Sequence, residues 1–185
     1  MQSLLQAGAA STDRFYEEIW TMRKKVAFLG IFLALALIFS YVESMIPFFF
    51  GVPGMKLGLA NIVVVILLYC MGTKEAYGVS VARVLLAGFL FGNLYSILYS
   101  LAGALLSLGV MFLLKKTGKF KIISVSAVGG ICHNIGQLLV AMFAVENYRI
   151  AYYLPVLLIA GLITGILIGI VAQEVVLRVR QYFEQ

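Results

Sequence analysis

Residues 152–176 read YYLPVLLIAGLITGILIGIVAQEVV, and this apolar stretch decides the class of the fold. Glu174 is its only charged residue. An α-helix needs about 20 consecutive apolar residues to cross the hydrocarbon core of a bilayer. The stretch is long enough to do so, and it therefore predicts a membrane-spanning helix.

Five similar apolar segments precede this one, so we predict an all-α, polytopic membrane protein with a compact bundle of six transmembrane helices. The second and third segments are short, and the polar residues 72–75 between them are typical of a tight helical hairpin. The predicted spans are Val26–Ile46, Leu57–Met71, Ala76–Phe91, Tyr95–Leu114, Ile122–Val145 and Tyr152–Val176.

The composition supports the same class. The chain has 185 residues, of which 63% are hydrophobic and 12% are charged. Soluble domains carry roughly a quarter charged residues, so this chain has too few to cover a surface that faces water. We therefore predict a single membrane domain over residues 23–185 and exclude a soluble enzyme.

The N-terminal segment, residues 1–22, differs from the rest of the chain. Phe15, Ile19 and Met22 recur at helical spacing, which is typical of an amphipathic helix lying on the inner membrane surface. A disordered cytoplasmic leader is the alternative. Acidic residues at positions 13, 17 and 18 argue against a cleavable signal peptide.

Basic residues are distributed unevenly between the ends of the predicted spans. With the N-terminus inside, ten of them lie at inner ends, whereas Lys56 and Arg149 lie outside. Cytoplasmic loops carry such an excess of lysine and arginine. We therefore predict a bacterial cell-membrane protein with both termini inside. Contact with anionic membrane lipids accounts for the net charge of +6, and no nucleic-acid partner is needed.

Several polar residues interrupt the apolar spans. An ionisable side chain at the centre of a bilayer costs about 3 kcal/mol on insertion scales, so such residues are expected to be paired or functional. Counted along each helix, most of them lie in the outer half, which is typical of a binding pocket. The predicted substrate-binding residues are Glu43, Lys56, Asn61, Arg83, Asn93, Tyr99, His133, Asn134 and Gln137.

Structural roles would also account for several of these residues. Arg83 is expected about 10 Å from the inner side at about 1.5 Å per residue, where it would pair with Glu43 or with carbonyls at a helix end. His133 would be a buried histidine whose hydrogen bonds are satisfied. Asn134 and Gln137 would form interhelical hydrogen bonds worth about 1 kcal/mol each.

The loop after the first span reads PFFFGVPGMKLGLAN from residue 47 to residue 61. Its central Pro-Gly pair is a turn signal, and its three successive phenylalanines are too apolar for a free loop. We predict a gating loop over the pocket, with Phe49, Pro53 and Gly54 as its principal residues. An aromatic belt at the membrane interface is the alternative, both here and for the tyrosines at positions 95 and 99.

Small residues recur every four positions on the first and sixth spans. Gly30 and Ala34 form such a pair on the first span, and this spacing lets helix backbones approach closely. Packing inside the bundle is the usual reason for such spacing, and docking of a partner membrane subunit at Gly30 and Ala34 is the alternative on the first span.

Motifs for several enzyme chemistries are missing from the sequence. It contains no phosphate-binding Walker A loop for ATP hydrolysis, and no paired carboxylates of the kind that hold Mg²⁺ on a diphosphate. Cys70 and Cys132 match no metal-binding or redox spacing. We therefore expect neither a catalytic site nor a cofactor or metal in this chain.

Two sequence runs carry a family resemblance. PGMKLGLAN at residues 53–61 and HNIGQ at residues 133–137, together with Glu43 and Arg83, resemble the Gx transporter family, which is also known as heptaprenyl diphosphate synthase component I. The resemblance covers roughly residues 24–178. The layout of six helices is also similar to that of the S components of energy-coupling factor (ECF) transporters.

This resemblance implies a substrate-binding membrane subunit without its own ATPase. In S components the loop after the first helix gates the pocket, and small residues on the first helix meet a T subunit that works with two ATPase subunits. Gly30 and Ala34 stand where an Ala-xxx-Ala pair is usual. The substrate would be a small vitamin-like or cofactor-precursor molecule, such as a flavin, a thiamine-like ring, a quinone precursor or a short prenyl compound. The second hypothesis is a non-catalytic membrane subunit for polyprenyl diphosphate or quinone synthesis.

Overall fold

The computed structural model describes residues 2–45, 58–144 and 146–183, with side chains from residue 21 to residue 179 within these ranges. The described residues form helices and no strand, which confirms the predicted all-α membrane bundle. The elements are α1 (Gln2–Met45), α2 (Asn61–Cys70), α3 (Thr73–Phe91), α4 (Leu94–Thr117), α5 (Ile122–Ala144), the 3₁₀ helix η1 (Tyr148–Tyr153) and α6 (Leu154–Phe183).

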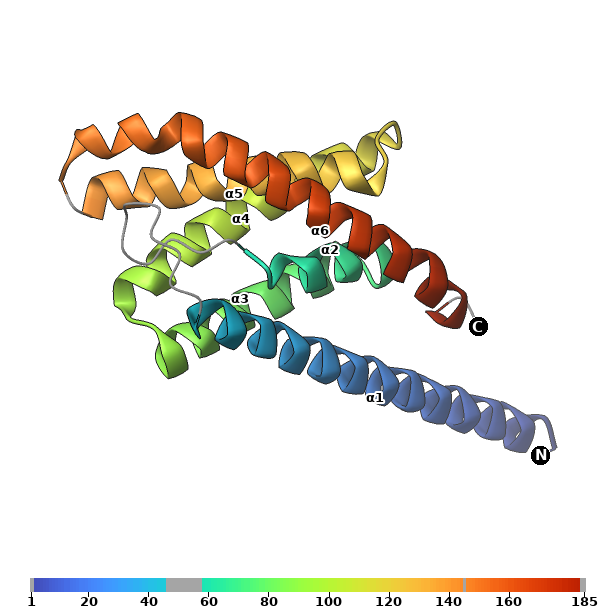
Figure 1. Cartoon of the computed structure of the whole chain (residues 1–185). Helices are drawn as coiled ribbons and strands as arrows, with labels where there is room; N and C mark the ends of the chain where they lie inside the picture. Colours follow the sequence, from blue (N-terminus) through green and yellow to red (C-terminus); the bar gives the residue numbers. More distant parts are fainter. Residues whose placement is uncertain (1, 46–57, 145, 184–185) are drawn as a thin grey trace.

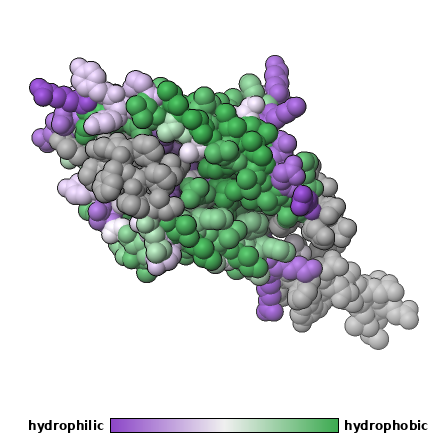
Figure 2. Space-filling model, in the orientation of Figure 1, coloured by the Kyte–Doolittle hydropathy of each residue, from purple (hydrophilic) through white to green (hydrophobic). Residues whose placement is uncertain are grey.

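Four helical segments are long and apolar enough to cross a membrane: Thr21–Met45 within α1, α4, α5, and Tyr148–Val179 across η1 and α6. Figure 2 shows a broad hydrophobic surface between hydrophilic patches at opposite ends of the molecule. Such a surface needs lipid around it. The protein is therefore a multi-pass membrane protein.

The second predicted span is shorter than expected. Whereas Leu57–Met71 was predicted, α2 has 10 residues, which at about 1.5 Å per residue is half the ~30 Å hydrocarbon thickness. The shortening has a local cause, because Gly58 has a φ of 83° and the chain turns at Leu59 and Ala60 before the helix begins. The predicted hairpin is present, with Gly72 between α2 and α3 at a φ of 130°.

Helix α5 packs against both α4 and α6 (Figure 1), and glycines allow these close contacts. A Cβ atom added at Gly130 on α5 would lie 2.2 Å from the carbonyl oxygen of Gly161 on α6. Likewise, one added at Gly136 would lie 2.8 Å from the carbonyl oxygen of Ala102 on α4. These contacts are possible because glycine has no side chain, and they place α5 in the middle of the group.

The long helix α1 lies at the edge of the bundle and packs mainly against α3. It is continuous from Gln2, so no break in the backbone separates residues 2–22 from the first span. Figure 1 shows α1 diverging from the other helices toward its N-terminal end, which lies at the same end of the molecule as the C-terminal end of α6. This arrangement is compatible with termini on one side of the membrane.

Candidate functional site

A turn before α2 brings α1 and α2 together. The backbone N–H of Gly58 donates a hydrogen bond to the Oε1 atom of Glu43, which is buried near the end of α1. A side chain at Gly58 would be strained by the positive φ, and its Cβ would lie 2.8 Å from the Nδ2 atom of Asn61. Glycine at this position therefore allows Glu43 and Asn61 to meet at one turn.

Arg83 on α3 faces the same end of α1. Its side chain is 4% exposed, its Nη1 atom lies 3.5 Å from the hydroxyl oxygen of Ser40, and its guanidinium interacts electrostatically with Glu43. The Nε and Nη2 atoms have no hydrogen-bond partner among the described residues. The guanidinium thus joins the polar groups near the end of α1, although counting along α3 placed Arg83 nearer the inner side. A long side chain makes this reach possible.

His133 and Gln137 add polar atoms from α5. Both side chains are buried, and the Nε2 atom of His133 lies 3.1 Å from the Nε2 atom of Gln137. Because an amide nitrogen donates, this assignment makes the histidine Nε2 the acceptor and puts the ring proton on Nδ1. Gly103 on α4 leaves room for the pair, since a Cβ there would lie 3.0 Å from the ring.

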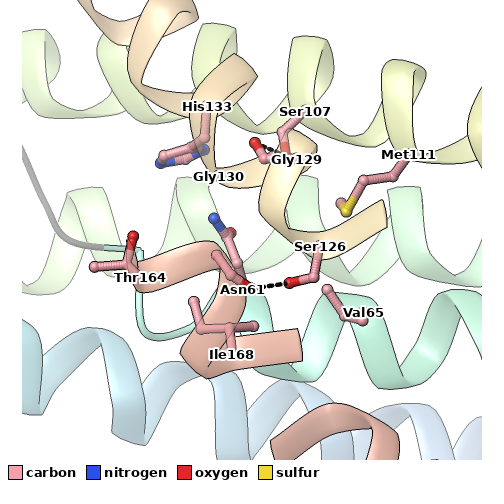
Figure 3. Close-up of a pocket in the computed structure, with 11 residues that line it drawn as sticks. Asn61, Val65, Ser107, Met111, Ser126, Gly129, Gly130, His133, Thr164 and Ile168 are labelled. Carbon is pink, nitrogen blue, oxygen red and sulfur yellow. Dashed lines mark hydrogen bonds between the residues drawn. The ribbon is translucent and has the colours of Figure 1, made fainter. Parts of the chain in front are cut away.

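A small cavity of about 10 Å³ lies beside Asn61 and His133 (Figure 3). The hydroxyls of Ser107 and Ser126 border it and donate to the carbonyls of Gly129 and Gly165, each at 2.8 Å. About one water molecule fits such a space, whereas pockets for small-molecule ligands measure roughly 300–1,000 Å³. Of the polar groups described above, Asn61 and His133 line this cavity, and Glu43, Arg83 and Gln137 do not. The cavity is too small for a ligand of ordinary size.

Residues 32–175 match the family described as heptaprenyl diphosphate synthase component I. The chain belongs to this family. No curated protein and no solved structure matches the chain. The part that matches the heptaprenyl diphosphate synthase component I family contains the whole polar cluster that we define as Ser40, Glu43, Asn61, Ser80, Arg83, His133 and Gln137.

Three residues that the sequence grouped with this cluster have other surroundings. The Asn134 side chain donates to the carbonyl of Leu157 on α6 at 2.8 Å, which is the interhelical hydrogen bond expected of a structural residue. Asn93 caps α4 by accepting a 2.8 Å hydrogen bond from the backbone N–H of Ser96. Tyr99 is buried in a separate apolar group between α4, α5 and α6.

Two further members of the cluster, Ser40 and Ser80, were missed as site residues. Each is buried and lies three positions before a charged residue, Glu43 on α1 and Arg83 on α3. Residues three apart on a helix share a face, and this spacing is the signal that would have identified them. The Ser80 hydroxyl makes no hydrogen bond to any described residue.

The remaining predicted residues fall into two groups. Lys56 and the gating-loop residues Phe49, Pro53 and Gly54 lie outside the described residues. Gly30 and Ala34 are exposed on α1, and a Cβ added at Gly30 would meet no atom within 4 Å. Packing inside the bundle therefore does not explain this pair of small residues.

Proposed function

We propose that this member of the heptaprenyl diphosphate synthase component I family is the substrate-binding membrane subunit, or S component, of an ECF-type importer. The observation that supports it most is the polar cluster within an apolar bundle. The cluster draws on α1, α2, α3 and α5, which are far apart in sequence. Its substrate would be a small vitamin-like or cofactor-precursor molecule taken up from outside.

The energetics of burial favour binding over a purely structural role. An ionisable group inside a bilayer is costly, and leaving its hydrogen-bond donors unmatched adds to that cost. Asn134 shows what a structural polar residue looks like here, because its amide donates to a single carbonyl on the next helix. Arg83 instead retains donors that a polar substrate would match.

The proposed importer needs an energised partner, since the sequence has no phosphate-binding loop. We propose a T subunit with two ATPase subunits, docked on the face of α1 that carries Gly30 and Ala34. A groove of about 590 Å³ lies between α1 and α3, and Gly30, Lys25 and Glu75 are among the residues that line it. In the proposed orientation, in the bacterial cell membrane with both termini inside, this groove opens near the cytoplasmic surface.

Co-purification with candidate T and ATPase subunits tests this function. Ala34→Trp should abolish assembly and transport, because a bulky side chain prevents close approach of a partner helix. Leu106→Trp is the matched control, since Leu106 is also exposed to lipid but lies on α4. Both variants should retain ligand binding. Transport by the wild-type chain alone, driven by an ion gradient in liposomes, would refute the S-component assignment.

The family description favours one second candidate, a non-catalytic membrane subunit associated with polyprenyl diphosphate synthesis. In either case we propose that the chain is not itself an enzyme, because the paired carboxylates of a diphosphate-Mg²⁺ site are missing from its sequence. Mass spectrometry of molecules extracted from the purified protein separates the two functions. A water-soluble cofactor precursor supports uptake, whereas a prenyl chain or a bound soluble synthase supports the second candidate.

A further inference from the structure

We propose that Arg83 is the docking point for an acidic group with two oxygen atoms, a carboxylate or a phosphate, on the molecule that this protein binds. This inference rests on the proposed substrate-binding function and specifies the chemistry of its ligand. The evidence for it is the set of contacts that the Arg83 guanidinium makes and the hydrogen-bond donors that lie beside it.

The free edge of the guanidinium has a defined shape. Of its three nitrogens, Nη1 is directed to the Ser40 hydroxyl at 3.5 Å, and Nε and Nη2 have no partner among the described residues. The N–H groups of Nε and Nη2 point from one side of the planar group. Two parallel donors on one edge match the two oxygens of a carboxylate or phosphate, which is how arginine recognises such groups.

Burial makes this free edge informative. On a protein surface water would satisfy these donors, but Arg83 is only 4% exposed within an apolar bundle. The hydroxyl of Ser80, one turn earlier on α3, is likewise buried without a hydrogen-bond partner among the described residues. These groups on α3 can all donate hydrogen bonds, and an acidic group on the ligand would supply the acceptors.

The charge of Arg83 is distinct from its hydrogen-bonding edge. Glu43, held by the N–H of Gly58, interacts electrostatically with the guanidinium and offsets its charge. An arginine needed only to balance Glu43 would be replaceable by lysine. An arginine that grips two oxygens would not be, because lysine offers a point charge without the planar fork. This difference separates a binding role from a structural role.

The test uses the full-length protein in nanodiscs with ¹⁵N-labelled arginine, and three probes with the same six-carbon tail: hexanoate, hexyl phosphate and hexanol. The Nε–H signal of Arg83 is assigned by its loss in Arg83→Lys. Should that variant be unstable, the other five arginines are replaced singly by lysine. At least one acidic probe should shift the Arg83 signal, and hexanol should not.

Affinity measurements then distinguish the contribution of the paired N–H donors of Arg83 from that of its positive charge. Arg83→Lys should weaken binding of the acidic probe by about 10- to 100-fold, as expected for the loss of charge-assisted hydrogen bonds. Arg149→Lys, the same change at an exposed arginine outside the polar cluster, should change the affinity by less than about threefold. A response to hexanoate alone assigns a carboxylate, and a response to hexyl phosphate alone assigns a phosphate. A response to both supports the shared chemistry.

Three results would overturn the inference: no shift of the Arg83 signal with either acid, equal binding of hexanol, or unchanged affinity in Arg83→Lys. A co-purified ligand without an acidic group, in a chain that assembles with ATPases, would also overturn it while leaving the proposed function intact. Conversely, acid binding at Arg83 in a chain that joins no T subunit would refute the ECF assignment and retain the site.

Discussion

The contact between α5 and α6 yields a quantitative prediction at Gly130. Replacing Gly130 with alanine places a Cβ atom 2.2 Å from the carbonyl oxygen of Gly161, about 1 Å closer than the tightest ordinary contacts of this kind. Backbone atoms lie on both sides, so no side chain can rotate away. The two helices must separate, and overpacking of this kind costs about 1–3 kcal/mol. Gly130→Ala should lower the free energy of unfolding by that amount.

A second glycine provides the control. Gly78 also lies within a helix, α3, but a Cβ added there would meet no atom within 4 Å. Gly78→Ala should leave stability unchanged or raise it by up to about 1 kcal/mol, because alanine favours the helix. Reversible unfolding in mixed micelles of increasing SDS content measures both variants. The close-packing argument is refuted if Gly130→Ala is as stable as Gly78→Ala.

Three further predictions concern polar residues. Asn134→Leu removes the hydrogen bond to the Leu157 carbonyl, so it should lower stability by about 0.6–1.7 kcal/mol and leave binding of the co-purified ligand unchanged. Gln137→Leu should preserve the fold and weaken that binding several-fold; normal affinity would exclude Gln137 from the site. Lys25, by hydrogen bonding, lowers the pKa of Glu75 below its usual 4.5. The ion pair therefore stabilises the fold above pH 4.5, and this stabilisation is lost as the pH falls through the lowered pKa of Glu75. When the pH is lowered from 6 to 3, the thermal unfolding temperature should fall more for the wild type than for Glu75→Gln.

Much of the fold could be predicted because a bilayer restricts the choice of structure. A spanning segment must be apolar and must satisfy its own backbone hydrogen bonds, so long hydrophobic runs predict helices directly. The same rule predicted the length of α2 less well. The apolar run begins before the helix does, and hydropathy does not reveal the turn at Gly58 that shortens α2 to 10 residues. Glycine there was visible in the sequence, but its positive φ was not.

The candidate site was predicted in part. The sequence shows Arg83, His133 and Gln137 as candidate site residues, because each is a polar side chain within an otherwise apolar segment. Their partners were not evident, since a partner on another helix depends on how the helices rotate and cross. Asn134 illustrates this limit, because its side chain donates to the carbonyl of Leu157 on α6, and nothing in the sequence of α5 identifies that partner.

The amino-acid sequence by itself determined the membrane class, the order of the helices and the family, because these depend on local composition and on short runs of residues. Tertiary packing decided which polar groups meet. It brought Gly58 to Glu43 and Ser40 to Arg83, and it left the Nε and Nη2 atoms of Arg83 without a partner among the described residues. The physical reason is that the residues of such a pair lie in parts of the chain far apart in sequence, and the distance between them is set by close contacts between helices, such as Gly130 against Gly161.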